Sequence, residues 1–333
     1  MLDYSTTAFV FPGQGSQSVG MLAALAASDS VVRATFDEAS SELGFDLWKL
    51  AQEGPKEQLD STHNTQPVML AAGVATWRLW RNRGGAEPVV VSGHSLGEFT
   101  ALVCAQALEF RTAISLVRFR GQVMQEAVPA GTGAMAAILG LEDADVVKAC
   151  AEAAAGEVVQ AVNFNSPGQV VIAGQASAVL RAIETAKAHG AKKAITLPVS
   201  VPSHSSLMLE AGKRLSERLA KVEIRTPKIR CLSAVDVNEH SDPAEIRAHL
   251  GRQLSSPVRW WETIRALTGQ GIALTIECGP GKVLTGLNRR IERGPGSEFL
   301  ALEDAASIDA ALAAAGTATP ATAAATPATH SRS

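Results

Sequence analysis

The sequence has few of the features that would place it in a membrane, secreted or nucleic-acid-binding class. Its apolar runs all fall short of the ~18 residues that a membrane-spanning helix needs. Its net charge is only −3, and no run of Lys and Arg offers a basic surface. The first residues, MLDYSTT, have neither the basic nor the apolar region of a signal peptide. We therefore expect a soluble, cytoplasmic protein that binds neither nucleic acid nor membrane.

Cysteine is also scarce. The four cysteines are widely separated and none forms a C-x-x-C pair: Cys104, Cys150, Cys231 and Cys278. A disulfide framework or a thiolate zinc site needs closer, regular spacing. We expect buried, reduced thiols and no metal site.

What the sequence does have is an alternation of strand and helix patterns. Its 333 residues, 46% of them hydrophobic, suffice for about two domains of ~150 residues each. Short apolar runs separated by helical patterns favour a parallel sheet flanked by helices. The runs that predict strands are Ala8–Phe11, Pro88–Val91, Ile229–Ser233 and Ala273–Glu277.

A second unit interrupts this pattern between residues 130 and 198. Its predicted order is strand, helix, strand, strand, helix, strand, which is the ferredoxin-like arrangement. The predicted elements are Ala134–Leu139, Glu142–Ala155, Val158–Phe164, Gln169–Ala173, Ala176–His189 and Lys193–Leu197. We therefore expect an α/β body made of residues 1–129 and 199–312, with a ferredoxin-like insert at 130–198. Residues 315–333 are mainly Ala, Thr and Pro, a composition that predicts a disordered tail.

One short stretch points to catalysis. The apolar run Pro88–Val91 leads into the segment GHSLG, which a helical pattern, Glu98–Leu108, follows. A serine between two glycines at a strand-to-helix break is the sequence form of a nucleophile elbow. Gly93 and Gly97 permit the tight turn, and Ser95 stands where free backbone N–H groups receive negative charge. We predict that Ser95 is a nucleophile rather than a structural serine.

A serine nucleophile needs a base. His204 follows the last strand of the insert, where the chain re-enters the body and a cleft would form. His94 adjoins Ser95, but we expect its side chain to leave the opposite side of the strand end. The carboxylates between them in sequence, Asp143 and Asp145, fall on a helix of the insert. A Ser-His dyad is thus favoured over a triad, although position alone leaves His204 open between base and structural residue.

Two further features remain ambiguous at this level. The loop FPGQGSQ after the first strand fails the dinucleotide fingerprint, because Ser18 stands where the third glycine belongs. The loop is either the second half of an oxyanion hole or a plain connecting turn. Arg118 and Arg120 share a helical pattern, Arg111–Val128, and either guanidinium could bind a carboxylate.

Seven motifs together resemble one known family. From Thr7 to about Leu302, the chain resembles the malonyl-CoA:acyl carrier protein transacylases of fatty acid synthesis and the acyltransferase domains of polyketide synthases. The motifs are FVFPGQGSQ (9–17), NTQP (64–67), GHSLGEF (93–99), RFRGQVMQEAVP (118–129), NFNSPGQVVIAG (163–174), SVPSHSSLM (200–208) and ECGPGKVL (277–284).

The resemblance implies an α/β-hydrolase-like body with a ferredoxin-like insert, and it assigns roles to residues. Ser95 matches the family's acylated serine, His204 its general base, and Arg120 the arginine that binds the free carboxylate of malonate. The backbone N–H groups of Gln14 and Leu96 match the oxyanion hole. Three further matches are Gln66 and Asn165, as side chains lining the site, and Gln253, whose backbone carbonyl orients the histidine.

The implied reaction moves a malonyl group from malonyl-CoA to the phosphopantetheine thiol of holo-acyl carrier protein, through a malonyl-serine intermediate. It requires no metal, nucleotide or redox cofactor. Because carrier proteins are acidic, we expect a local basic patch to meet the partner, with Lys187, Lys192 and Lys193 as candidates. We expect a monomer.

Three other functions share part of this evidence. A simple esterase or thioesterase would use Ser95 and His204 but would not need Arg120. An acyltransferase dedicated to a polyketide carrier would have the same chemistry with another partner. A non-enzymatic scaffold would have no physical reason to keep the serine, the histidine, the arginine and both glycine-rich loops.

Overall fold

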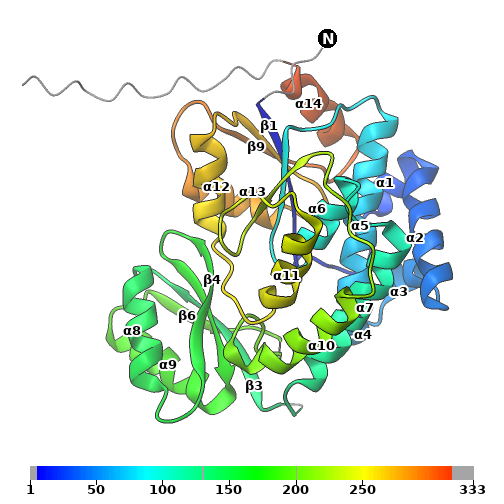
Figure 1. Cartoon of the computed structure of the whole chain (residues 1–333). Coiled ribbons are helices and arrows are strands. Elements are labelled where there is room, and N and C mark those ends of the chain that lie inside the picture. Colours follow the sequence, from blue (N-terminus) through cyan, green and yellow to red (C-terminus); the bar gives the residue numbers. More distant parts are fainter. Residues whose placement is uncertain (1–5, 130, 200, 317–333) are drawn as a thin grey trace, which may run out of the picture.

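The fold consists of a larger α/β body and a smaller unit built on a second sheet (Figure 1). The computed structural model describes residues 6–129, 131–199 and 201–316. Nearly all of the predicted disordered tail therefore lies outside the described residues. Within the described ranges, each helix is too short or too polar to cross a membrane.

A parallel sheet of five strands forms the centre of the body. Its order is β7-β2-β1-β8-β9, and each neighbouring pair is parallel. The strands are β1 (Thr7–Phe11), β2 (Val90–Gly93), β7 (Arg230–Ser233), β8 (Leu274–Glu277) and β9 (Glu298–Ala301). Because the strands are parallel, their carboxyl ends share one edge of the sheet, which is where ligands bind in open α/β sheets.

Both faces of this sheet are buried, which explains the continuous apolar runs in its strands. In β1, Phe9 and Phe11 enter one core cluster, while Ala8 and Val10 enter another on the opposite face. This alternation follows from the two-residue repeat of a strand. Phe9 packs edge-on against Trp80, with ring centroids 5.1 Å apart.

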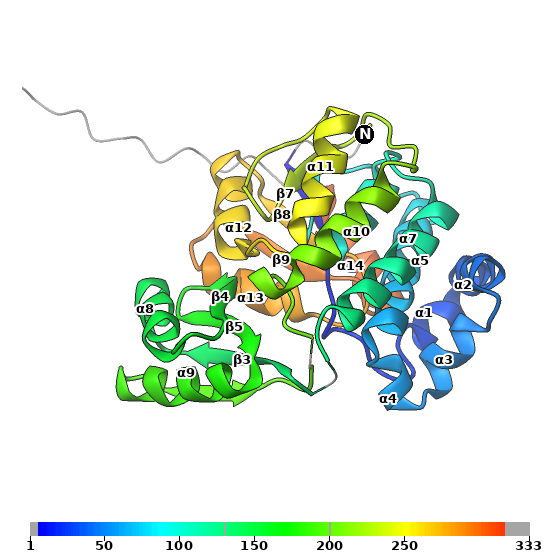
Figure 2. The same cartoon turned by 60° about the horizontal axis from the view of Figure 1, so that its bottom comes forward.

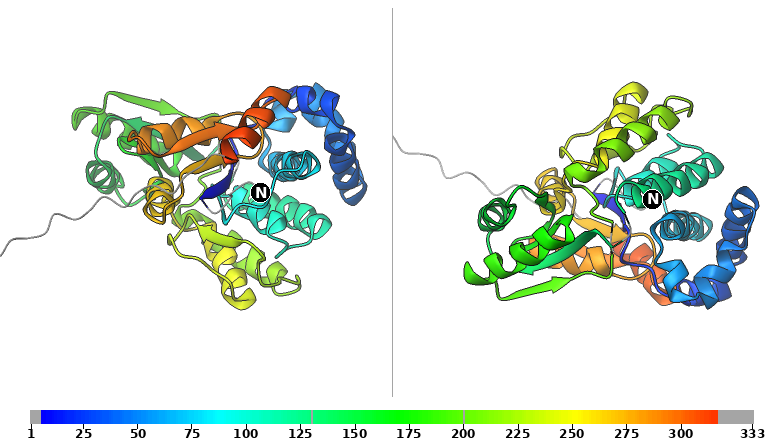
Figure 3. Two further views of the ribbon diagram at one scale, coloured as in Figure 1. Left: turned by 90° about the horizontal axis from the view of Figure 1, so that it is seen from above. Right: turned by 90° about the horizontal axis from the view of Figure 1, so that it is seen from below.

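Helices cover the sheet on both sides, and the N-terminal ones lie at the end of the molecule opposite the small unit (Figures 2 and 3). The body helices are α1 (Ala23–Ser28), α2 (Ser30–Leu43), α3 (Leu47–Glu53), α4 (Lys56–Leu59), α5 (Thr62–Asn82), α6 (Gly97–Cys104), α7 (Phe110–Glu126), α10 (Leu209–Leu219), α11 (Pro243–Gln253), α12 (Trp260–Gly269), α13 (Val283–Ile291) and α14 (Ala305–Ala315), with a 3-10 turn, η1 (Ser206–Met208).

The small unit has the predicted ferredoxin-like order. Its elements are β3 (Gly133–Leu139), α8 (Asp143–Ala153), β4 (Val159–Ser166), β5 (Gln169–Gln175), α9 (Ala176–Ala188) and β6 (Lys193–Thr196). The strands form an antiparallel sheet of order β4-β5-β3-β6. One face packs on α8 and α9, while Met135 and Val171 belong to a small apolar cluster on the other side.

Backbone hydrogen bonds join this unit to the body. The Phe164 N–H donates to the Val258 carbonyl at 2.8 Å, and the Val258 N–H donates to the Val162 carbonyl at 2.8 Å. The Trp261 indole N–H also donates to Asp143 of α8 at 2.9 Å. These contacts fix the small sheet beside the carboxyl edge of the large one.

The fold class predicted from the sequence is confirmed: a parallel α/β body carries an antiparallel ferredoxin-like insert. One predicted element was too long. The helix after Ser95 ends at Cys104 rather than Leu108, because Gln106 takes a positive φ of 60° and the Ala107 N–H turns back to the Leu102 carbonyl. Strand β9 and helices α10, α11 and α14 were not predicted.

Candidate active site

Ser95 lies on a sharp turn between β2 and α6. The strand ends at Gly93, the helix begins at Gly97, and the Gly97 N–H closes the turn on the His94 carbonyl at 2.9 Å. Ser95 itself has a φ of 54°, a left-handed conformation that costs a non-glycine residue about 1–3 kcal/mol. The surrounding structure imposes this geometry, as expected for a nucleophile elbow.

The two flanking glycines are required by close backbone contacts. A Cβ atom at Gly93 would lie 2.0 Å from the Gly97 carbonyl carbon, and one at Gly97 would lie 2.0 Å from the Phe11 carbonyl oxygen. Neither contact involves a side chain that could move aside. The turn therefore tolerates only glycine at both positions.

His204 meets Ser95 across the junction between the insert and the body. Its Nε2 atom lies 2.7 Å from the Ser95 Oγ atom. Its Nδ1 atom lies 3.0 Å from two backbone carbonyl oxygens, those of Gln253 and Ser256. Since carbonyls only accept, Nδ1 carries the proton and Nε2 presents its lone pair to the serine. No carboxylate is hydrogen-bonded to His204 in the described part of the chain, so the arrangement is a dyad.

Burial keeps the imidazole of His204 neutral. The side chain is enclosed, and this desolvation, with the positive charge of Arg120 as the next cause, lowers the pKa of His204 to about 3. The Gln253 carbonyl opposes the shift by favouring the N–H at Nδ1. A neutral imidazole at physiological pH is the form that can take a proton from a serine.

Arg120 extends from α7 into the same site and is only 1% exposed. Its Nη1 group donates to Gln66 Oε1 at 2.9 Å, and Nη2 donates to Gln253 Oε1 at 2.9 Å and to Ser95 Oγ at 3.3 Å. Burial lowers the pKa of Arg120 to about 9, opposed by the charge of Glu98. The guanidinium still carries its charge at neutral pH, and within the described ranges its side-chain acceptors are Gln66, Gln253 and Ser95 rather than a carboxylate.

Arg118, the alternative left open by the sequence, lies elsewhere. Its Nη1 group donates to the His63 carbonyl at 3.0 Å and bonds Asn64, and its guanidinium lies over the Phe45 ring. Of the two arginines, Arg120 lines the pocket beside Ser95 and Arg118 does not.

A pocket of about 310 Å³ contains the reactive groups. This volume is within the range of small-molecule sites. Met135 and Leu197–Val199 of the insert form one wall. The residues lining it from the body include Gln14, Gly15, Gln17, Lys56, His94, Ser95, Leu96, Arg120, Met124 and His204.

The remaining predicted residues divide into two groups. Gln14 and Leu96 line the pocket, and the Leu96 amide is one of the first N–H groups of α6, which have no partner within the helix. Gln66 and Asn165 are not among the lining residues. Each stands behind one: Gln66 accepts from Arg120, and Asn165 Oδ1 lies 2.9 Å from His94 Nε2.

The expectation that His94 points away from the site is not met, because His94 is among the residues that line the pocket. Its Nε2 atom is engaged with Asn165, and burial lowers the pKa of His94. The structure therefore holds His94 by Asn165 and brings His204, not His94, to the serine hydroxyl.

Two groups of the site were not predicted from the sequence: the side chain of Gln253 and the carboxylate of Glu98. Gln253 Nε2 donates to Glu98 Oε2 at 2.6 Å and to the Ser95 carbonyl at 3.0 Å, while its Oε1 accepts from Arg120. One amide thus connects the serine, the arginine and a buried acid. The signal that could have identified Glu98 is the presence of an acidic residue in the otherwise apolar helical segment EFTALVC.

Comparison with known proteins decides the family. Residues 8–297 match the acyl transferase domain family. The chain is 55% identical over 284 residues to the malonyl CoA-acyl carrier protein transacylase of Escherichia coli K12, covering 85% of this chain and 92% of that protein. This chain belongs to the malonyl-CoA:acyl carrier protein transacylase family. It is an acyltransferase, and the family resemblance found in the sequence is confirmed.

More distant relatives and solved structures agree. The Bacillus subtilis protein of the same name is 43% identical over 310 residues, covering 92% of this chain and 96% of that one. The solved structure of the malonyl CoA-acyl carrier protein transacylase from Coxiella burnetii superposes with a TM-score of 0.92 at 50% identity, covering 94% of this chain and 98% of the other. A malonyl-transacylase solved in complex with its type II polyketide synthase acyl carrier protein superposes with a TM-score of 0.91 at 51% identity, covering 93% and 99%.

Proposed function

We propose that this acyltransferase transfers the malonyl group of malonyl-CoA to the phosphopantetheine thiol of holo-acyl carrier protein, by a ping-pong reaction through malonyl-Ser95. The supporting observation is one constellation in one pocket: the Ser95 hydroxyl lies 2.7 Å from the neutral nitrogen of His204 and 3.3 Å from the Arg120 guanidinium. The nucleophile and its base therefore meet beside an enclosed cation.

In the first half-reaction, His204 Nε2 removes the proton of Ser95 Oγ as the oxygen attacks the thioester carbonyl. The carbonyl π electrons move onto oxygen, where the backbone N–H groups of Gln14 and Leu96 donate to the oxyanion. Each such donor contributes about 3 kcal/mol to transition-state stabilisation. The C–S bond then breaks, CoA leaves as the thiol with the proton from His204, and malonyl-Ser95 remains.

The second half-reaction reverses the sequence with a different thiol. His204 removes the proton of the carrier's phosphopantetheine thiol, whose sulfur attacks the serine ester. The C–O bond to Ser95 breaks and the serine recovers its proton from His204. Since an ester and a thioester are exchanged without a change of oxidation state, we propose that no metal, nucleotide or redox cofactor takes part.

Arg120 supplies the proposed preference for a malonyl group. Its planar guanidinium can bind the free carboxylate in a two-bond arrangement. An acetyl group would leave the buried cation with only the neutral acceptors Gln66 and Gln253. Leaving a buried charged group without its partner costs about 2–5 kcal/mol, which corresponds to a preference of roughly 30-fold or more.

The acidic carrier protein is proposed to approach over the insert. Lys193 is the first residue of β6 and Lys192 precedes it; β6 is an edge strand, and the chain continues from it into Leu197–Val199 of the pocket wall. Lys187, the third candidate, is ion-paired with Glu184 at 2.7 Å, so part of its charge is offset. Reversing the charges of Lys192 and Lys193 is expected to raise KM for the carrier and leave acylation by malonyl-CoA unchanged. An unchanged carrier KM would remove this surface from the proposal.

We propose a carrier of fatty acid elongation as the partner. One structural neighbour was solved with a type II polyketide carrier, so carriers of both types need to be tested as partners. Competition between holo-carriers of the two types, at equal concentration, tests this choice. Preferential loading of the polyketide carrier would indicate that the enzyme serves polyketide synthesis instead of fatty acid elongation.

The experiment that tests the function is the mass of the intact protein after brief incubation with malonyl-CoA or acetyl-CoA. A malonyl adduct that Ser95→Ala abolishes and holo-carrier discharges would support the transferase. Free CoA without an adduct would indicate a hydrolase. The absence of both an adduct and free CoA would favour a scaffold. Arg120→Gln is expected to lose the preference for malonyl over acetyl labelling, whereas the control Arg118→Gln is expected to keep it.

A further inference from the structure

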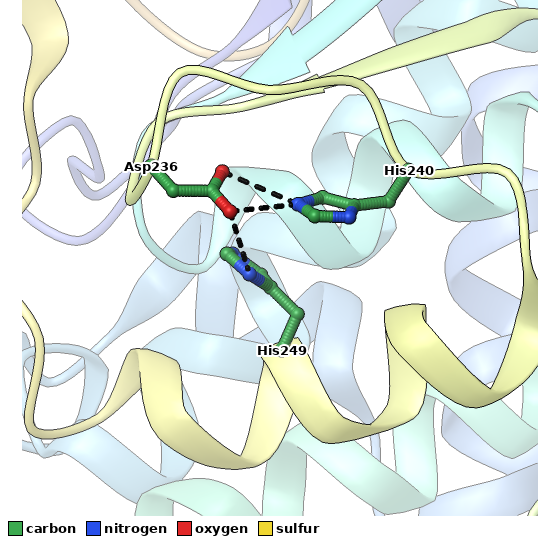
Figure 4. Close-up of side chains that lie close together, drawn as sticks. All are labelled: Asp236, His240 and His249. Carbon is green, nitrogen blue, oxygen red and sulfur yellow. Dashed lines mark hydrogen bonds and ion pairs between the residues drawn. The ribbon is translucent and has the colours of Figure 1, made fainter.

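A second polar cluster lies behind the active site, on the far side of Glu98. Asp236 and His240 stand on the loop between β7 and α11, and His249 stands on α11 (Figure 4). Each offers one ligand atom, and these atoms lie within 4.8 Å of one another. None of the three residues belongs to the chemistry proposed above, and none is needed for it.

Backbone hydrogen bonds hold the loop in place. The Ser233 N–H donates to the Asn238 carbonyl at 2.9 Å, and the His240 N–H donates to the Cys231 carbonyl at 3.3 Å. Asp236 Oδ1 accepts from the Asn238 N–H at 3.2 Å, which orients the carboxylate. The loop therefore returns on β7 and presents Asp236 and His240 to the same side of α11.

The hydrogen bonds around His249 leave one ring nitrogen without a partner. His249 is 2% exposed, and its Nε2 atom lies 2.6 Å from the Ser233 Oγ atom. The Ser233 hydroxyl also interacts with Glu98, whose carboxylate only accepts, so we assign the hydroxyl hydrogen to Glu98 and the Nε2–H of His249 to Ser233 Oγ. The Nδ1 atom then carries a lone pair, is buried and has no hydrogen-bond partner among the residues that the structure describes.

This lone pair faces a carboxylate. His249 Nδ1 lies 3.7 Å from Asp236 Oδ2, beyond hydrogen-bond distance, and His240 Nε2 lies 2.9 Å from the same oxygen. Two acceptors thus face each other, the His249 nitrogen and the Asp236 oxygen, and they repel each other unless a cation lies between. The Nε2–H of His240 donates to the same oxygen, and this nitrogen becomes a third ligand when a metal ion replaces its proton. Burying a hydrogen-bond acceptor without a donor destabilises the folded state, so this arrangement points to a bound cation that would satisfy the His249 nitrogen.

We propose that Asp236, His240 and His249 form a binding site for a divalent transition-metal ion, with Zn²⁺ as the ion of choice. A tetrahedral ion bonded at about 2.0–2.2 Å needs ligand atoms spaced somewhat over 3 Å, which small side-chain rotations achieve here. Imidazole ligands favour Zn²⁺ over Mg²⁺ and Ca²⁺. Water supplies the remaining coordination position, because three protein ligands leave it open.

The groups around the cluster suit a cation. Ser233 and Glu98 lie beside the Nε2 atom of His249, the ring nitrogen that would not bind the metal. Outer-sphere contacts of this kind fix the tautomer in which the opposite nitrogen, Nδ1, is free to bind a metal ion. Glu245 lies 3.9 Å from His240 at the exposed side and adds negative charge. Arg259 donates to the Asp236 backbone carbonyl at 3.3 Å, and Glu262 pairs with its guanidinium, which offsets the positive charge that Arg259 places near Asp236.

This site departs from the expectation of no metal, which rested on cysteine spacing. The nearby Cys231 does not contribute a thiolate, because burial raises the pKa of its thiol. Bound Zn²⁺ would tie the β7–α11 loop to α11, the helix that ends at Gln253. Its expected effect is on stability, and it holds whether or not the proposed transfer reaction is correct.

The test is metal binding by the full chain after chelation and dialysis. We expect one Zn²⁺ per chain by titration calorimetry, a rise in Tm with Zn²⁺ but not with Mg²⁺, and visible absorption of tetrahedral intensity with Co²⁺. Asp236→Asn and His240→Gln keep the size of partly exposed side chains. Each is expected to weaken Zn²⁺ binding by at least about tenfold, the lower end of what even an outer-sphere partner costs.

His189→Gln is the matched control, because His189 pairs with Glu152 on the insert and belongs to another part of the fold. It is expected to bind Zn²⁺ as the parent does. Binding that is absent from the parent protein, or equal in the parent, Asp236→Asn and His240→Gln, would overturn the proposal. In that case Asp236 and His240 form an ordinary ion pair.

Discussion

The Oε1 atom of Gln253 accepts a hydrogen bond from Arg120 at 2.9 Å, while the backbone oxygen of the same glutamine lies 3.0 Å from His204 Nδ1. One residue therefore positions both the substrate-binding cation and the base. The two functions use different atoms, so substitution can separate them.

Gln253→Ala is expected to remove the side-chain contact and keep the backbone carbonyl. Arg120 would lose one of its two amide acceptors, and a buried charged group without an acceptor costs about 1.5–3 kcal/mol. We expect KM for malonyl-CoA to rise about 10- to 100-fold, with a smaller change in kcat, in steady-state assays. Gln270→Ala is the control, because Gln270 accepts from the exposed Arg230. A drop confined to kcat would contradict this role.

The pH dependence of acylation reports on His204. Because burial and Arg120 lower its pKa to about 3, the imidazole is neutral throughout pH 5–8. The single-turnover rate constant for malonyl-Ser95 formation is therefore expected to be flat over this range. Rapid-quench mass measurement would check it. An inflection near pH 6.5, the ordinary value for histidine, would show that the base is not enclosed as described.

Gly93→Ala tests the close packing at the elbow. The new Cβ would lie 2.0 Å from backbone, so strand β2 or helix α6 must shift. We expect a loss of about 3 kcal/mol or more in the free energy of unfolding, measured with urea. Gly286→Ala is the matched control on α13, where an added Cβ has no neighbour within 4 Å. It is expected to be neutral or to stabilise by up to ~1 kcal/mol.

Glu277 makes stability depend on pH. It accepts from the Leu284 and Thr285 N–H groups at the start of α13, and burial raises its pKa to about 7 from an ordinary 4.5. The folded protein thus holds a proton that the unfolded chain releases at lower pH. Stability from this group is full below about pH 4.5 and is lost as the pH rises through 7, on the order of 3 kcal/mol in all.

Glu277→Gln is expected to flatten the dependence of Tm on pH between 5 and 8. Glu210→Gln, which removes an exposed carboxylate that pairs with Lys213 on α10, is the control and should leave the slope unchanged. Equal slopes in the parent and in Glu277→Gln would contradict the assignment.

The elements recoverable from the sequence were those with local signals. The βαββαβ insert was predicted from hydrophobic periodicity and turn residues, and Ser95 was found because its strand, turn and helix are contiguous. Strand β9 is four residues long at the sheet edge, and its pattern is too short to distinguish from a loop. The first seven residues of the predicted helix after the elbow, 98–104, were right, but its last four were not, since Gln106 breaks the helix through a positive φ.

The candidate site shows the same limit. Position alone left His204 and the two arginines open, because orientation depends on contacts far apart in sequence. The tautomer of His204 comes from two carbonyls on the segment after α11, and the choice of Arg120 comes from Gln253. The same holds for His249, whose unpartnered nitrogen exists only once the β7–α11 loop has folded back.

The chain order of these elements has a consequence for synthesis. The Ser95–His204 contact spans 109 residues, and the central strand β1 is flanked by β2 and by β8, which ends at residue 277. During translation the elbow emerges first, and the whole insert must follow before a base can reach it. The nucleophile on a nascent chain is therefore inert, and the enzyme gains its reactivity only when nearly complete.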